Sequence, residues 1–277
     1  MEISYFQSKA SETDVNKKPL VALLGLAGEI GSLYAVYKKR LRDKPSVENF
    51  QLELSEELGD ILWYISALAT LHEIDLEKVA SDNLHKTQAF FGSVNSPIFD
   101  SDFPENERLL DHMRVEFTLT GEGRSQMMFE GILLGDPLSD NSNEEDKYRF
   151  HDAFHLAFLA NLHWSPVMRR LLKRKRKSNP AVDENEDGAR AAIVEEAIVA
   201  IIFTHAEEND FFQTKESIPM KLVTLIMKMA SKFEVRNCSS SAWRNAIYDG
   251  CRAFKALNKN SGGAIEIDLQ TSTLLVG

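Results

Sequence analysis

The sequence predicts a mainly α-helical protein, in which a helical bundle precedes a helical domain with a small antiparallel β-sheet. Three observations lead to this prediction. Apolar residues recur at helical spacing through the first 90 residues, a segment rich in Gly, Ser, Asn and Pro follows, and short stretches of alternating polarity come next. The chain has 277 residues, enough for two modest domains. We therefore expect domains at 1–95 and 114–277, joined by a linker at 96–113.

Long helices dominate the first expected domain. The first runs from about residue 17 to 42, with Pro19 where an early helical turn tolerates it. The second runs from about residue 47 to 72, because its apolar residues repeat at helical spacing. The third runs to about residue 91, and Asp75 is its expected N-cap.

The second expected domain combines strands with helices. Residues 115–120 and 127–134 alternate in polarity around a turn-prone GEGR sequence, which predicts a hairpin. Residues 264–269 alternate as well and are expected to add a strand. Further helices are expected at 145–163, 166–177, 184–206, 218–234 and 240–258.

Composition narrows the class of protein. Hydrophobic residues make up 43% of the chain and charged residues 27%, which argues against disorder throughout. No apolar run approaches the roughly 20 residues that cross a bilayer, and the N-terminus lacks the features of a secretory signal. The two cysteines, Cys238 and Cys251, cannot form a disulfide framework. We expect a cytoplasmic protein with no membrane partner.

Negative charge is concentrated in the first part of the chain. The net charge is −10, and residues 1–112 hold 11 Lys and Arg against 19 Asp and Glu. This balance disfavours nucleic-acid binding there, because attraction to phosphates needs clustered cations. Acidic residues gathered in one place would instead suit a divalent metal ion.

Four acidic residues gather on the second predicted helix, namely Glu53, Glu56, Glu57 and Asp60. Helical geometry places Glu57 and Asp60 about 60° apart, with Glu53 between them. Crowded carboxylates repel one another unless a cation compensates, and hard oxygen ligands favour Mg²⁺, or Mn²⁺, over Zn²⁺. The alternative is a solvated acidic helix face.

Three separated motifs resemble those of the MazG-type all-α nucleoside triphosphate pyrophosphohydrolases. They are GLAGEIG at 25–31, EELGDILWY at 56–64 and NLHK at 83–86, and the resemblance covers about residues 1–91. It implies a MazG-type helical bundle that cleaves a nucleoside triphosphate between its α- and β-phosphates, giving a monophosphate and pyrophosphate. It also implies a homodimer or homotetramer made by packing helices against a copy.

The resemblance also assigns roles to individual residues. Glu29 matches the first glutamate of the family's ExxE motif, while Glu57 and Asp60 match its ExxD motif. These three are the expected catalytic residues and Mg²⁺ ligands. Asn83 and Lys86 match positions that face the substrate. The nearby Trp63 is a candidate for stacking on the base, with core packing as its alternative role.

The sequence departs from the family pattern at the first motif. Ser32 replaces the second glutamate of ExxE, and a serine is a weak Mg²⁺ ligand. Glu53 could supply the missing carboxylate, since it shares the metal face, and Glu53 or Glu56 could join the metal ligands. Two functions follow. One is an Mg²⁺-dependent pyrophosphohydrolase in nucleotide-pool control or antiviral nucleotide depletion. The other is a nucleotide-binding sensor with a weakened site that signals through its C-terminal domain.

The second domain resembles the C-terminal domain that accompanies some MazG-like proteins, through residues 148–155, 164–166 and 183–196. It holds a group of ligand-type residues: His151, Asp152, His155, Glu195 and Glu196. The two histidines are four residues apart and share a helix face, whereas the two glutamates lie in an apolar helix. The group is either a second metal site or a buried polar network in which the histidines satisfy the glutamates.

A dense basic stretch lies at residues 169–177, on a predicted amphipathic helix. A solvated helix end is one interpretation, because cations suit a helix C-terminus. Capture of a phosphate-rich ligand or of nucleic acid is the other. Apart from this stretch, we expect no nucleic-acid partner.

Overall fold

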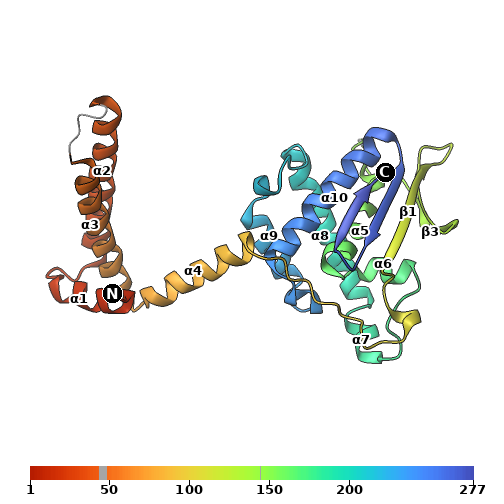
Figure 1. The fold of residues 1–277 in the computed structure, drawn as a ribbon, viewed down its shortest axis with the longest axis horizontal. Helices are drawn as coiled ribbons and strands as arrows, with labels where there is room; N and C mark the ends of the chain where they lie inside the picture. Colours follow the sequence, from red (N-terminus) through yellow and green to blue (C-terminus); the bar gives the residue numbers. More distant parts are fainter. Residues whose placement is uncertain (44–48, 144) are drawn as a thin grey trace. The chain divides into compact units, whose positions relative to one another are not determined.

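A computed structural model describes residues 1–43, 49–143 and 145–277, and it confirms the mainly α-helical class (Figure 1). The chain divides into two compact units, 1–87 and 88–277. The segment at 96–113, which composition marks as a linker, belongs to the second unit and contributes the buried residues Asp100, Glu107 and Leu109 to it.

The first unit is built of helices. They are α1 (Ile3–Thr13), α2 (Pro19–Asp43), α3 (Phe50–Leu71) and the first part of α4 (Leu76–Phe91). We did not predict α1. Residues 47 and 48, at the predicted start of the second helix, lie outside the described residues. Asp75 is the N-cap that we predicted, because its Oδ1 accepts the backbone N–H groups of Glu77 and Lys78 at 3.0 and 3.2 Å.

The helices α2 and α3 pack closely side by side (Figure 1). Gly25 on α2 lies against the ring of Tyr64, and a Cβ atom at this position would be 2.2 Å from the ring. Trp63 packs edge-on against Tyr64, and its Nε1–H donates to Thr13 Oγ1 at 2.8 Å. These contacts fix α3 against both α1 and α2.

We expect Gly25→Ala to destabilise the first unit by about 1–3 kcal/mol, because Tyr64 must turn away from α2 to admit the methyl group. Gly59→Ala is the matched control. No atom lies within 4 Å of a Cβ built there, so this substitution in α3 should stabilise the helix by up to about 1 kcal/mol. Thermal unfolding followed by circular dichroism measures both. Equal stability of the two variants would contradict this packing.

The second unit contains an antiparallel sheet in the order β3-β2-β1-β4-β5. The strands are β1 (His112–Leu119), β2 (Ser125–Phe129), β3 (Ile132–Leu138), β4 (Gly263–Asp268) and β5 (Thr273–Val276). The central strand β1 alternates between exposed and buried side chains, as expected for a sheet with one solvated face. The helices α5 (Asp152–Leu162) and α10 (Ser240–Asn260) cover the other face (Figure 1).

The core of this unit centres on α5, whose residues are buried along its whole length. α10 approaches it closely, since a Cβ atom at Gly250 would lie 2.5 Å from the Phe154 ring. The unit also contains α6 (Pro166–Leu171), α8 (Ala189–Glu208) and α9 (Met220–Met229), which contact this pair, and α7 (Pro180–Asn185), which contacts α8. Cys238 and Cys251 are buried free thiols.

The predicted hairpin around GEGR is confirmed as β1 and β2, which pair antiparallel. The second strand, predicted at 127–134, is wrong as a single element, because a tight turn divides it into β2 and β3. Glu130 and Gly131 have φ values of 49° and 75°, the two left-handed residues that a two-residue hairpin of this kind needs. Glutamate is an uncommon residue at such a position, so residue type alone does not indicate the turn. The strand at 264–269 is confirmed as β4, whereas β5 was not predicted.

The predicted helix at 166–177 is also wrong beyond Leu171, where α6 ends; Lys173 already has a left-handed φ of 57°. The basic stretch is therefore only partly solvated: Arg170, Lys173 and Lys177 are exposed. Arg169 and Arg176 are buried, with 1% of each exposed, and both pair with carboxylates. Because these two arginines are buried, they do not contribute to a basic surface that could attract a nucleic acid.

The helix α2 is long and apolar enough over Pro19–Arg42 to cross a membrane, with a mean hydropathy of 1.6. We predicted from the sequence that no apolar run approaches this length. Length and composition alone are weak evidence, because core helices also pass this test. Glu29 lies within this stretch, where a charge would be costly in a bilayer. α2 packs against α3, but only 11% of this stretch is buried in the structure.

Candidate functional site

The acidic site of the first unit is built from α2 and α3. Two contacts define how these helices align: Gly25 lies against Tyr64, and Lys39 Nζ bonds Glu53 Oε1 at 2.9 Å. The two helices are therefore antiparallel. The same alignment carries Glu29, one turn after Gly25, toward the part of α3 that bears the ExxD motif.

The electrostatics of Glu57 show that the acidic residues are neighbours. Partial desolvation raises the pKa of its carboxyl, and the negative charges of Glu29, Asp60, Glu56 and Glu53 raise it further. Carboxylates from both helices thus act on one group. This crowding is the condition under which a divalent cation stabilises an acidic cluster.

The alignment also places Ser32 near Glu57, where the family pattern has its second glutamate. Glu53 does not fill this gap in the structure, because Lys39 holds its carboxylate at 2.9 and 3.3 Å. Glu53 would have to leave Lys39 to bind a metal ion. Its proposed role as the replacement ligand remains a prediction.

The carboxylates of this cluster are not drawn tightly together. Within the described ranges, the group whose metal-ligand atoms all lie within 4.8 Å of one another is His151, His155 and Glu196. Mutual repulsion explains an open acidic cluster, and Mg²⁺ commonly keeps several waters and uses only one or two protein carboxylates.

The predicted substrate-facing residues, Asn83 and Lys86, lie on α4. Both side chains are exposed, and their role toward a substrate stays a prediction. Trp63 is half-buried and uses its indole N–H in the contact with Thr13, which favours its packing role.

The second group of predicted site residues does come together. His155 on α5 directs Nδ1 to Glu195 Oε1 at 2.7 Å and Nε2 to Glu196 Oε2 at 3.3 Å. His151, just before α5, places its Nε2 3.7 Å from the same Glu196 oxygen. The buried Asp152 begins α5 beside them but is not one of the three converging residues.

Comparison with known protein families decides the identity of both units. Residues 18–89 match the MazG nucleotide pyrophosphohydrolase domain, and residues 94–277 match the MazG C-terminal domain. The chain belongs to the MazG family. The acidic cluster lies in the domain for which nucleotide pyrophosphohydrolase activity is described, and the histidine cluster lies in the C-terminal domain.

Among individual proteins, the MazG-family chain is 40% identical over 68 residues to the Gene 37 protein of Mycobacterium phage L5. The match covers 24% of this chain and 60% of the phage protein. The chain therefore spans less than two thirds of this relative's length. No solved structure matches the chain significantly.

Further residues, which we did not predict from the sequence, hydrogen-bond the cluster in the MazG C-terminal domain. Glu195 accepts hydrogen bonds from Ser165 Oγ at 2.6 Å and from the Val167 backbone N–H at 2.8 Å. His151 Nδ1 bonds the Tyr148 carbonyl at 2.9 Å, and the Tyr148 ring stacks on the imidazole. The sequence indicates Ser165 as a helix N-cap, because a proline follows it. The sequence does not indicate that Ser165 contacts Glu195, which lies 30 residues further along the chain.

Charges in this cluster shift the pKa values of the histidines in opposite directions. Burial would lower the pKa of His155, but Glu195 and Glu196 outweigh it and raise the pKa to about 10. Burial dominates at His151 and lowers its pKa. Without a metal ion, His155 is therefore an imidazolium between two glutamates, which is the buried polar network that the sequence allows.

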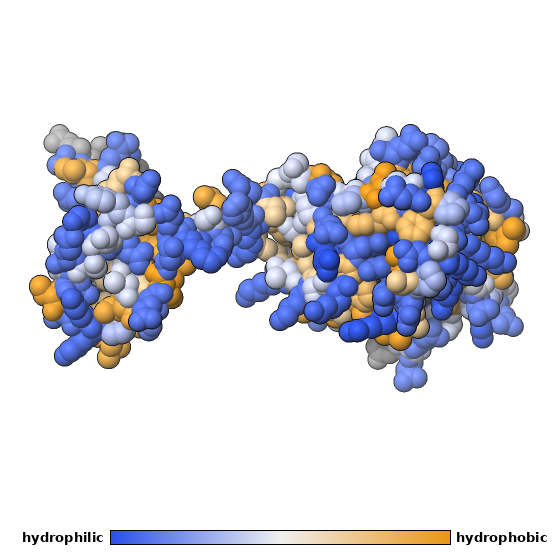
Figure 2. Space-filling view, turned by 90° about the horizontal axis from the view of Figure 1, so that it is seen from below, coloured by the Kyte–Doolittle hydropathy of each residue, from blue (hydrophilic) through white to orange (hydrophobic). Residues whose placement is uncertain are grey.

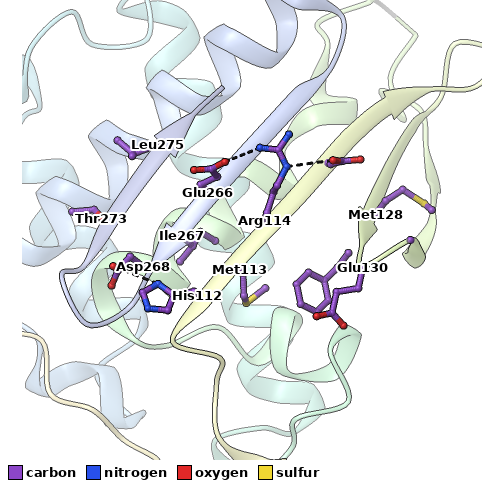
Figure 3. A pocket seen from close by; sticks show the side chains of 13 residues that line it. His112, Met113, Arg114, Met128, Glu130, Glu266, Ile267, Asp268, Thr273 and Leu275 are labelled. Atoms are coloured by element: carbon purple, nitrogen blue, oxygen red, sulfur yellow. Dashed lines mark hydrogen bonds and ion pairs between the residues drawn. The ribbon is translucent and has the colours of Figure 1, made fainter.

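A hollow of about 650 Å³ lies on the solvated face of the MazG C-terminal sheet (Figure 3). Most of its charged side chains pair with one another. Arg114 bonds Glu266 at 2.6 Å and Glu116 at 3.4 Å, and His112 lies 3.4 Å from Asp268. These pairs account for the polar character of the hollow, so we assign no chemistry to it.

Proposed function

We propose that this MazG-family chain is a Mg²⁺-dependent nucleoside triphosphate pyrophosphohydrolase, which converts a (d)NTP and water into the (d)NMP and pyrophosphate. One observation carries the proposal: carboxylates from α2 and α3 are close enough to raise the pKa of Glu57 together. Such a cluster is suited to a divalent ion bound to a triphosphate. The experiment that tests it is pyrophosphate release from a panel of NTPs and dNTPs.

Glu29, Glu57 and Asp60 would hold the ion, with Mn²⁺ as a possible substitute for Mg²⁺. A bound ion would neutralise the charge that develops on the phosphates and would activate a water molecule. Lys86 offers a point charge to a phosphate, and Asn83 a neutral hydrogen-bonding group. The proposed setting is the cytoplasm, in nucleotide-pool control or antiviral nucleotide depletion.

We propose that the first unit works as a homodimer or higher homo-oligomer. Figure 2 shows apolar surface, in orange, on this unit. Large side chains on α2 are open to solvent, with Leu20 66%, Leu23 53% and Leu24 64% exposed. An apolar groove of about 590 Å³ runs between Leu20, Leu68 and Val79. A patch of this kind is suited to a second copy, and assembly would also cover α4 near Asn83 and Lys86.

Light scattering behind a sizing column tests this assembly. We expect the wild-type chain to elute as a dimer or tetramer, and Leu20→Glu to shift it toward the monomer, because the new charge would be buried in the groove. Ile193→Glu is the control, since Ile193 is 68% exposed in the second unit. A monomeric wild type, or recovery of the chain with lipid vesicles, would contradict the proposal.

Ser32 favours a second candidate function, a nucleotide sensor that binds without efficient turnover and signals through the C-terminal domain. Ser32→Glu restores the missing carboxylate next to Glu57. If the missing carboxylate limits the activity of the wild-type enzyme, we expect Ser32→Glu to bind Mg²⁺ about 10-fold more tightly and to release pyrophosphate faster. Ser81→Glu, an exposed site on α4, should change neither. Tight nucleotide binding with no turnover in wild type and Ser32→Glu would establish the sensor instead.

A further inference from the structure

The cluster in the C-terminal domain has the geometry of a metal site that the pyrophosphohydrolase function does not use. Nε2 of His151, Nε2 of His155 and a Glu196 oxygen all lie within 4.8 Å of one another. In a tetrahedral zinc site with bonds of 2.0–2.1 Å, two ligand atoms are about 3.3 Å apart. The observed separations from Glu196 to the two histidines are 3.3 and 3.7 Å.

The hydrogen bonds on the far side of each ring select the tautomer that a metal ion needs. His151 Nδ1 faces the Tyr148 carbonyl, and His155 Nδ1 faces Glu195. Both acceptors require a proton on Nδ1, so a metal ion that displaces the Nε2 proton of His155 would meet the Nε2 atoms of both rings beside the same Glu196 oxygen. Metal-binding histidines usually donate their other N–H to a carboxylate or a backbone carbonyl in this way.

The supporting shell is rigid, whereas one side of the cluster is open. Glu195 is fully buried and is fixed by Ser165 and the Val167 backbone, so it cannot turn to a different partner. The side chains of His151 and His155 are 9% and 0% exposed, but that of Glu196 is 45% exposed. A bound ion would therefore keep a coordination position toward solvent, as catalytic zinc sites do.

We propose that His151, His155 and Glu196 bind a divalent first-row transition metal, Zn²⁺ in the first instance, with Glu195 as the positioning residue behind His155. Two imidazoles and one carboxylate favour Zn²⁺ and its neighbours over Mg²⁺, which prefers oxygen ligands. This proposal is independent of the acidic cluster, because the ligands lie on α5, its preceding residue and α8 in the second unit.

The test measures zinc bound by the full chain in an excess of Mg²⁺, by elemental analysis and calorimetry. We expect about one Zn²⁺ per chain, and a visible spectrum typical of low-coordinate Co²⁺ when cobalt replaces it. Glu196→Gln and His151→Gln should each weaken zinc binding by at least about 100-fold. Loss of a residue that only hydrogen-bonds a metal ligand costs about 10–100-fold, so a larger loss indicates a direct ligand. Glu196 is partly exposed, so its variant tests the proposal even if His151→Gln fails to fold.

Two controls separate this site from other sources of binding. His205→Gln removes a histidine of the same unit that bonds its own helix at the Ile201 carbonyl, and it should leave zinc binding unchanged. Glu57→Gln should do so too, because it alters only the acidic cluster. Absence of stoichiometric zinc in the wild type would overturn the proposal and leave the polar network. Equal binding by the wild type and Glu196→Gln would overturn it as well.

Discussion

Glu57→Gln will lower the rate of pyrophosphate release by about 100-fold or more. The amide keeps the size of the side chain but removes the charge at the centre of the acidic cluster, where Glu29 and Asp60 act on the same group. Loss of a bound Mg²⁺ removes several kcal/mol of stabilisation from the developing phosphate charge, and each 1.4 kcal/mol is a factor of ten in rate. Steady-state assays across a range of Mg²⁺ concentrations measure the effect.

Glu12→Gln is the matched control for this prediction. Glu12 lies in the same unit and is 58% exposed, in a surface pair with Lys9, so its loss should leave turnover within about twofold of the wild type. Glu53→Gln separates the two interpretations of Glu53. A large loss of Mg²⁺ affinity would make it a ligand, whereas an unchanged affinity would leave it as the partner of Lys39. Full activity in Glu57→Gln would contradict the assignment of the acidic cluster.

Asp187→Asn will destabilise the second unit by about 3–5 kcal/mol. Arg176 is buried and donates to both Asp187 oxygens at 2.7 and 3.1 Å, while the Arg169 guanidinium lies 3.8 Å away. Removing one carboxylate leaves buried positive charge without compensation, which costs far more than an exposed pair contributes. Denaturant unfolding followed by the fluorescence of the buried Trp164 and Trp243 measures the change.

Glu266→Gln provides the comparison on the surface of the same unit. Glu266 pairs with Arg114 at 2.6 Å, but both side chains are more than half exposed. We expect a loss of no more than about 1 kcal/mol. If the two variants lose the same stability, the buried pairing of Arg176 with Asp187 does not stabilise this unit more than a surface pair does.

Much of the first unit could be predicted from sequence, because its helices and caps are determined by residues close to one another in the chain. Helical spacing alone placed Glu57 and Asp60 on one face, and the Asp75 cap followed from the residue type. The pairing of Glu53 with Lys39 was not predictable, because it depends on how two helices align across residues 44–48, part of the chain outside the described ranges.

The second unit was harder to predict because its contacts join distant parts of the chain. The basic stretch looked like a solvated helix since its partners, Asp100 and Glu234, are separated from it by about 60–70 residues. The spacing of His151 and His155 indicated a shared face, but only the fold shows that α8 brings Glu196 to the same point. Long-range pairing of buried charges leaves no periodic signal.

The most direct test of the central claim is ³¹P NMR of a nucleoside triphosphate incubated with the full chain and Mg²⁺. The acidic cluster on α2 and α3 predicts that the nucleoside monophosphate and pyrophosphate appear together, and that a chelator or Glu57→Gln stops both. Release of inorganic phosphate with the diphosphate, or an unchanged triphosphate across all bases and both sugars, would contradict the claim.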